Sequence, residues 1–159
     1  MSKKQEMQRF LRLYKDETGE RELDMHKVAA FAKRKGWVMP QPPSDVDLLA
    51  KQFQKAAHDE TKYDAKTGRP YRVYHAIPAN GQLNLFVYVD IDEATRPQMQ
   101  KSCVNRREQM ISDGVQLCFD MEHWNLINPT QEPLALPMDL TPDIEWRKAA
   151  EDDDDEEAA

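Results

Sequence analysis

The chain has 159 residues, 32% of them charged, and its formal net charge is −7. A chain of this length fits one ordinary domain that folds on its own core, and it contains no apolar run long enough to cross a bilayer. The first residues lead into a charged amphipathic segment rather than a signal peptide, so we expect a cytoplasmic protein with no membrane partner.

The acidic excess lies in one run near the C-terminus. Residues 151–157 are seven consecutive acidic residues, and the rest of the chain holds 22 acidic and 22 basic residues. A run of like charges without apolar residues gains too little from folding to offset the entropy lost on ordering. We therefore expect residues 151–159 to be a disordered acidic tail, serving either solubility or competition with nucleic acid for a basic surface.

Cysteine and motif patterns favour no catalytic class. Cys103 and Cys118 lack the paired spacing of a zinc site and are predicted to be free, buried thiols. The chain has no phosphate-binding glycine loop, no nucleophile elbow and no zinc-protease motif. We therefore expect no cofactor, and no named reaction is indicated.

Two helices are predicted first. Apolar residues recur at helical spacing over residues 4–16, and a second helix is expected from the N-cap Asp24 to Gly36. A third helix should begin after Ser44, because Pro42 and Pro43 exclude a helix through the preceding connection.

The third helix is predicted to be amphipathic with a basic side. Its apolar side, expected to face the core, comprises Val46, Leu49, Ala50, Phe53 and Ala57. The opposite stripe comprises Lys51, Lys55, His58 and Lys62. The alternative is a solvated helix face whose lysines only balance nearby acids.

A β-hairpin is predicted next, from residues 71–77 and 83–91 joined through residues 78–81. If Tyr71, Val73 and Ile77 share the aliphatic side of the second strand, the other side is polar and aromatic. That polar-aromatic face comprises Arg72, Tyr74, Asn84, Phe86 and Tyr88. Its rings are suited to stacking on unpaired bases, unless the following helix covers them.

The remaining elements are a long helix and an arm. Thr95 and Gln98 form a possible capping box for the helix. Four prolines between residues 129 and 142 predict an extended arm with apolar residues, lying on the domain itself, on a partner or on a second copy. The expected organisation is thus an α+β domain over residues 1–128, a Pro-rich arm over 129–150 and an acidic tail over 151–159.

The order of three helices, a hairpin and a helix resembles a winged-helix module of the helix-turn-helix type. This resemblance implies DNA binding, with the third helix in a groove and the hairpin wing on the flanking backbone. The residues it assigns to DNA are Lys51, Gln54, Lys55, His58 and Lys62 on the helix and Arg69 and Arg72 on the wing. Winged helices also dock proteins, so an adaptor subunit joining a larger complex through residues 129–150 is the alternative function.

A metal-dependent nuclease is the third hypothesis. Asp90, Asp92 and Glu93 follow a predicted strand, and carboxylates at a strand end are able to hold a divalent cation. The alternative is that they lie at the N-terminal end of the next helix, where acidic residues are common. His75 is a candidate general base if Asp90 lies beside it, and otherwise a hydrogen-bonded structural histidine.

Overall fold

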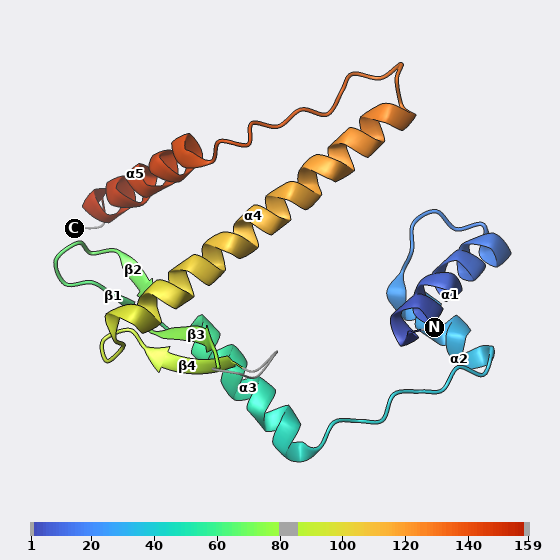
Figure 1. Ribbon diagram of the computed structural model, residues 1–159, viewed down its shortest axis with the longest axis horizontal. Coiled ribbons are helices and arrows are strands. Elements are labelled where there is room, and N and C mark those ends of the chain that lie inside the picture. Colours follow the sequence, from blue (N-terminus) through green and yellow to red (C-terminus); the bar gives the residue numbers. More distant parts are fainter. Residues whose placement is uncertain (1, 80–85, 158–159) are drawn as a thin grey trace. The chain divides into compact units, whose positions relative to one another are not determined.

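The computed structural model describes residues 2–79 and 86–157 and confirms a mixed α+β protein. The described part contains five helices and two small antiparallel hairpins (Figure 1). Where the sequence predicts a single domain over residues 1–128, the chain divides into two compact units, residues 1–48 and 49–159.

The first unit holds α1 (Lys3–Thr18) and α2 (Met25–Arg34), close to the predicted bounds. Asp24 caps α2 by accepting a hydrogen bond from the backbone N–H of His26 at 2.8 Å. Between the helices, the Tyr14 ring meets Phe31 edge-on with centroids 5.2 Å apart, and Phe10 contacts Phe31 and Trp37. This aromatic cluster is the core of the unit.

Helix α3 (Asp45–Asp59) begins where predicted, and its residues from Leu49 onward belong to the second unit. Ser44 Oγ accepts a hydrogen bond from the Asp47 backbone N–H at 3.2 Å. The prediction of a core-facing side was wrong, since α3 has no buried residue and Val46, Leu49 and Phe53 are 52–76% exposed. Helical periodicity marks which side is apolar, but burial requires another element to lie against that side.

Two hairpins follow α3, where one was predicted. The first pairs β1 (Thr61–Tyr63) with β2 (Pro70–Arg72), and the second pairs β3 (Tyr74–Pro78) with β4 (Phe86–Asp90). The predicted strand 71–77 is interrupted at Val73, whose N–H donates to Glu60 O at 3.1 Å. Val73 O in turn accepts from the Ile91 N–H at 2.8 Å, so this residue joins the two hairpins.

The second hairpin has the sides that were assumed for Ile77 and for the second strand, whereas Tyr71 belongs to the first hairpin. Ile77 pairs with Val87 and His75 with Val89, which places them on one side of the hairpin. Tyr74, Phe86 and Tyr88 belong to the other side. Predicted positions 83–85, including Asn84, lie outside the described residues.

The long helix α4 (Arg96–Ile127) covers the side of β3 that carries His75. Its capping box is present as predicted, with Thr95 and Gln98 each accepting a hydrogen bond from the other's backbone N–H. Val73, His75, Ile77 and Ser102 are all buried. These residues form the small core of the second unit. The predicted burial of the cysteines was wrong, since Cys103 is exposed and Cys118 is half-buried on α4.

The segment after α4 turns back along the helix (Figure 1). The Asn125 side chain accepts from the Leu134 N–H at 2.8 Å and donates to its carbonyl at 2.9 Å. A Cβ atom at Gly114 would lie 3.4 Å from Met138 Cε. Residues 134–138 therefore lie on α4.

The extended arm is shorter than predicted. Helix α5 (Thr141–Glu157) begins before residue 150, with Pro142 in its first turn, where the missing N–H removes no helical hydrogen bond. The backbone of α5 continues to Glu157, so the predicted disorder of the acidic tail is not confirmed.

Candidate nucleic-acid interface

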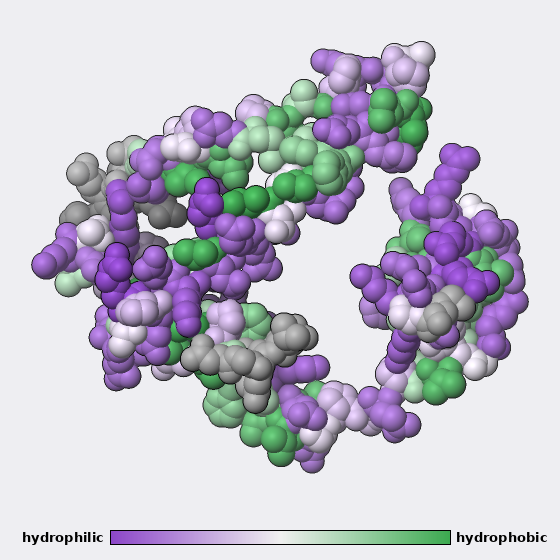
Figure 2. All heavy atoms as spheres, in the orientation of Figure 1, coloured by the Kyte–Doolittle hydropathy of each residue, from purple (hydrophilic) through white to green (hydrophobic). Residues whose placement is uncertain are grey.

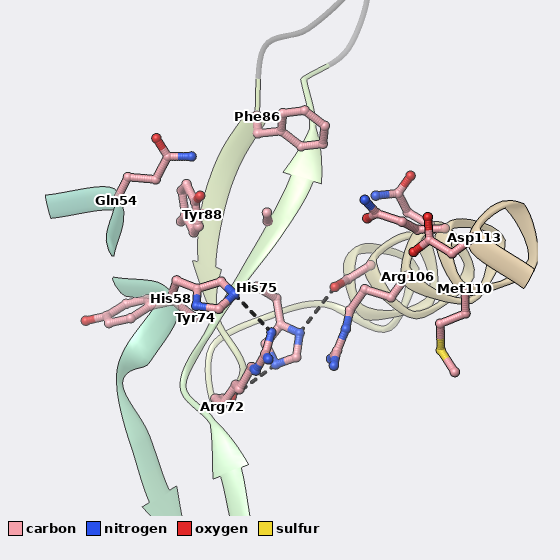
Figure 3. Close-up of a pocket in the computed structure, with 14 residues that line it drawn as sticks. Gln54, His58, Arg72, Tyr74, His75, Phe86, Tyr88, Arg106, Met110 and Asp113 are labelled. Carbon is pink, nitrogen blue, oxygen red and sulfur yellow. Dashed lines mark hydrogen bonds between the residues drawn. The ribbon is translucent and has the colours of Figure 1, made fainter. Parts of the chain in front are cut away.

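A hollow of about 480 Å³ lies in the second unit, between the end of α3, the second hairpin and α4 (Figure 3). Its lining combines cationic, aromatic and amide side chains. They include Gln54 and His58 of α3, Arg72 of β2, Tyr74 of β3, Phe86 and Tyr88 of β4, and Asn105, Arg106, Gln109 and Asp113 of α4.

Two sets of residues that the sequence suggested separately meet in this hollow. Gln54, His58 and Arg72 belong to the predicted DNA-contacting set. Tyr74, Phe86 and Tyr88 belong to the predicted polar-aromatic face, which Arg72 shares. The α4 residues lie across the hollow from the hairpin rather than over it (Figure 3), so the rings of this face border an open space.

The other predicted DNA-contacting residues do not line the hollow. Lys51 and Lys55 are exposed on α3. Lys62 does not continue the helical stripe, because α3 ends at Asp59 and Lys62 pairs with Tyr71 in the first hairpin. Arg69 directly precedes β2.

Arg72 is oriented by a chain of hydrogen bonds at the edge of the hollow. Its Nη1 lies 3.4 Å from His58 Nε2, and His58 Nδ1 lies 3.1 Å from the Asp59 carboxylate. A guanidinium only donates, so Nε2 is the acceptor and Nδ1–H donates to Asp59. Arg72 thus brings a positive charge to the edge of the hollow.

His75 has a structural environment. Its Nε2 lies 3.0 Å from Arg72 O and its Nδ1 lies 3.2 Å from Ser102 Oγ. Because a carbonyl only accepts, Nε2–H is the donor and Nδ1 accepts from the Ser102 hydroxyl. Asp90 pairs with Tyr74 on the opposite side of the hairpin, so the arrangement required for His75 as a general base is absent.

The strand-end carboxylates close a turn. Asp90 Oδ1 accepts from the Asp92 N–H at 2.9 Å, and Asp90 O accepts from the Glu93 N–H at 3.1 Å. Among the side chains that the structure describes, in residues 2–79 and 86–150, no three His, Cys, Asp or Glu residues are grouped to hold a metal ion. The observed role of Asp90 is thus to shape the connection to α4.

Sequence reasoning missed the α4 contribution to the hollow. Asn105, Arg106, Gln109 and Asp113 follow Ser102 at intervals of three, four, seven and eleven residues, which places them on one side of a helix. That polar stripe was a signal that the sequence contained. The structure shows which element the stripe faces.

The loop of the first hairpin depends on an ionised carboxylate. Asp64 accepts from the N–H groups of Thr67 and Lys66, each at 2.9 Å, and these bonds hold the pKa of Asp64 below its ordinary value. Because the pKa of Asp64 is lower in the folded state, ionisation of this carboxylate stabilises the fold at pH values above its ordinary pKa. This stabilisation is lost as the pH falls through the folded-state pKa.

We expect amide protection in the β1–β2 loop to persist from neutral pH down to about pH 4, the ordinary range of aspartate, and to fall in more acidic solution. Hydrogen exchange of residues 61–72 measures this directly. In Asp64→Asn, which keeps an acceptor oxygen but does not ionise, the local acid dependence should vanish. Loss of protection already near neutral pH would contradict the assignment to Asp64.

Comparisons with known proteins found no matching family model, no matching curated protein and no matching solved structure. In the part of the chain that the structure describes, no helix is both long and apolar enough to span a membrane.

Proposed function

We propose that this protein binds DNA, and that the hollow between α3, the second hairpin and α4 receives an unpaired base together with its phosphate. The observation that carries this proposal is the meeting of Arg72 and Arg106 with Tyr74, Phe86 and Tyr88 around one open space. Aromatic faces beside arginines are the combination that binds single strands with little dependence on sequence.

The chemistry of the lining assigns a role to each kind of residue. Tyr74, Phe86 and Tyr88 offer ring faces on which a base stacks, with each stacked base contributing roughly 1–3 kcal/mol. Arg72 and Arg106 neutralise phosphate, and Gln54 offers an amide for a base edge. The volume of about 480 Å³ falls within the size range of pockets that enclose small ligands and accommodates a nucleotide rather than a duplex.

The exposed lysines of α3 extend the proposed surface. Lys51 and Lys55 stand on the helix that also carries Gln54 and His58. In a winged-helix module this helix approaches the DNA, and lysines at such positions contact phosphates without reading bases. We propose the same use of α3 here, with the β1–β2 hairpin and Arg69 as the wing.

Fluorescence anisotropy with end-labelled oligonucleotides tests the proposal. A single strand is expected to bind more tightly than a duplex of the same sequence, and the logarithm of the affinity should fall linearly with the logarithm of salt concentration between about 50 and 200 mM. Absence of binding at the lowest salt, or binding that salt does not weaken, would refute the proposal.

Charge reversal on α3 is a separate prediction. Lys51→Glu combined with Lys55→Glu is expected to lower DNA affinity at least tenfold and to reduce the salt slope, because two phosphate contacts become repulsive. The matched control reverses Lys4 and Lys33, two exposed lysines of the first unit, and so produces the same net charge. An equal loss in both variants would mean that total charge, rather than α3, governs binding.

Protein interaction is the second candidate function. Among the described residues only four apolar side chains are buried, namely Tyr14, Val28, Val73 and Ile77. Apolar side chains reach the surface along α4 and the segment that follows it (Figure 2). A chain of this size that buries so little is typical of a protein that completes its core with a partner.

A further inference from the structure

The hollow has two chemically different ends along α4. Arg106 points toward the end that holds Arg72 and His75 (Figure 3). Asp113 lies at the other end, with Phe86 on the facing hairpin. Asp113 follows Arg106 by seven residues, which places the two on one side of the helix and about 10 Å apart along its axis. The hollow therefore has a cationic end and an anionic end.

The Asp113 side chain is exposed and unpaired. Within the described part of the chain, no residue donates a hydrogen bond to its carboxylate or forms an ion pair with it. The amide of Gln109, one helical turn earlier on the same side, also makes no hydrogen bond to a described residue. A carboxylate repels phosphate, so it weakens nucleic-acid binding unless the ligand donates hydrogen bonds to it. This end of the hollow therefore suits a base edge rather than a phosphate.

The separation of the two ends suits one nucleotide. The span of about 10 Å along α4 is comparable with the distance from a phosphate to the outer edge of its base. With the phosphate held by Arg72 and Arg106, the base lies between α4 and the rings of Phe86 and Tyr88. An unpaired base has no partner strand, so its Watson–Crick edge is free to face Asp113.

Guanine is the base whose Watson–Crick edge fits a carboxylate. Its N1–H and its exocyclic N2 amino group are adjacent donors, and a carboxylate has two acceptor oxygens. Adenine and cytosine each have one donor beside an acceptor, and thymine has one donor between two acceptors. Each of these three bases therefore sets an acceptor against the Asp113 carboxylate. The amide of Gln109 is able to donate to guanine O6, the acceptor next to N1–H.

We propose that the hollow selects an unpaired guanine, with Asp113 accepting from N1–H and the N2 amino group and Gln109 donating to O6. The inference rests on the proposed function and adds a base preference for the one nucleotide that enters the hollow. Arg72, Arg106 and the aromatic rings act on every nucleotide alike. Strands without guanine therefore still bind, but more weakly.

Anisotropy competition with the full chain tests the preference. The competitors are short oligothymidine strands that carry one central deoxyguanosine, deoxyinosine, deoxyadenosine or deoxycytidine. The deoxyguanosine strand should compete about tenfold better than the deoxyadenosine strand, because a bidentate contact discriminates between bases to about that extent. Deoxyinosine keeps N1–H and O6 but lacks the N2 amino group, so its strand should fall between these two. Stacking alone would rank the three purine strands together.

Asp113→Asn tests the assignment to this side chain. The amide keeps the size of the carboxylate but offers one acceptor and one donor, so the guanine preference should disappear. Plain oligothymidine should bind at least as well as to the unmodified protein, because a negative charge is removed. The matched control is Asp120→Asn, which makes the same change on α4 outside the lining of the hollow and should keep the preference. Circular dichroism checks that both variants keep their helix content.

Equal competition by all four strands, or a guanine preference that Asp113→Asn leaves intact, would overturn the proposal and leave DNA binding standing. Equal loss of the preference in both variants would also overturn the assignment to Asp113. Failure of every strand to bind would instead refute the proposed function, and this inference with it.

Discussion

Reversing Arg72 and Arg106 together is expected to lower the affinity for single-stranded DNA by about 100-fold at fixed salt, roughly tenfold for each phosphate contact. The two guanidiniums come from β2 and α4 and border the same hollow. Replacing both with glutamate removes two attractive contacts and places two carboxylates beside the aromatic rings. Anisotropy titration of each variant measures the loss.

The chain provides a matched control one residue away. Arg107 follows Arg106 on α4, but its side chain points about 100° further round the helix and is 74% exposed. Arg107→Glu changes the net charge as much as Arg106→Glu and should retain DNA affinity within a few-fold. Equal losses for the two single variants would show that the hollow has no special role.

The largest effect on folding is expected at Tyr14. Its ring is 3% exposed and packs edge-on against Phe31, and its hydroxyl donates to the Glu20 carboxylate at 2.7 Å. Tyr14→Ala would leave a cavity between α1 and α2 in a unit with few other buried side chains. We expect cooperative unfolding of residues 1–48, seen as a loss of hydrogen-exchange protection in α1 and α2.

Tyr14→Phe separates the ring from the hydroxyl. This variant keeps the contact with Phe31 and removes only the hydrogen bond to Glu20, so most of the protection should remain. Protection within α4 should be unchanged in both variants, because α4 belongs to the other unit. Retention of full protection in Tyr14→Ala would show that other contacts hold the first unit together.

The structural features that were predicted correctly from sequence depend on interactions between residues close together along the chain. The Thr95–Gln98 capping box and the Asp24 cap each involve groups within three residues. The alternation of apolar side chains shows that Val87 and Val89 share one side of the second strand, but the register that pairs Ile77 with Val87 comes from the structure. The burial of Val73 was harder to predict, because Val73 lies where two hairpins join and only one hairpin was predicted.

Part of the candidate site was predictable, because some of its residues can be recognised from the local sequence. Gln54, His58 and Arg72 stood out by residue type and by their place in the order of elements. Their position opposite Arg106 depends on the packing of α4 on β3, which is a contact between segments about 30 residues apart. Charge and spacing within one helix contain no information about which other element that helix will face.

By itself the sequence determined the local features: where most helices begin, which residues cap them, which side of each is apolar, and that the whole excess of negative charge lies in residues 151–157. Only the tertiary structure decided which apolar sides are covered. In the folded chain the apolar side of α3, which carries Phe53, is exposed. Residues 134–138 lie on α4, and Arg72 lines the same hollow as Arg106. The physical reason is that helix caps and strand alternation arise from interactions within a few residues. Burial depends instead on contacts between distant segments, and a local sequence pattern indicates neither the entropy lost in closing the chain between them nor how well they pack.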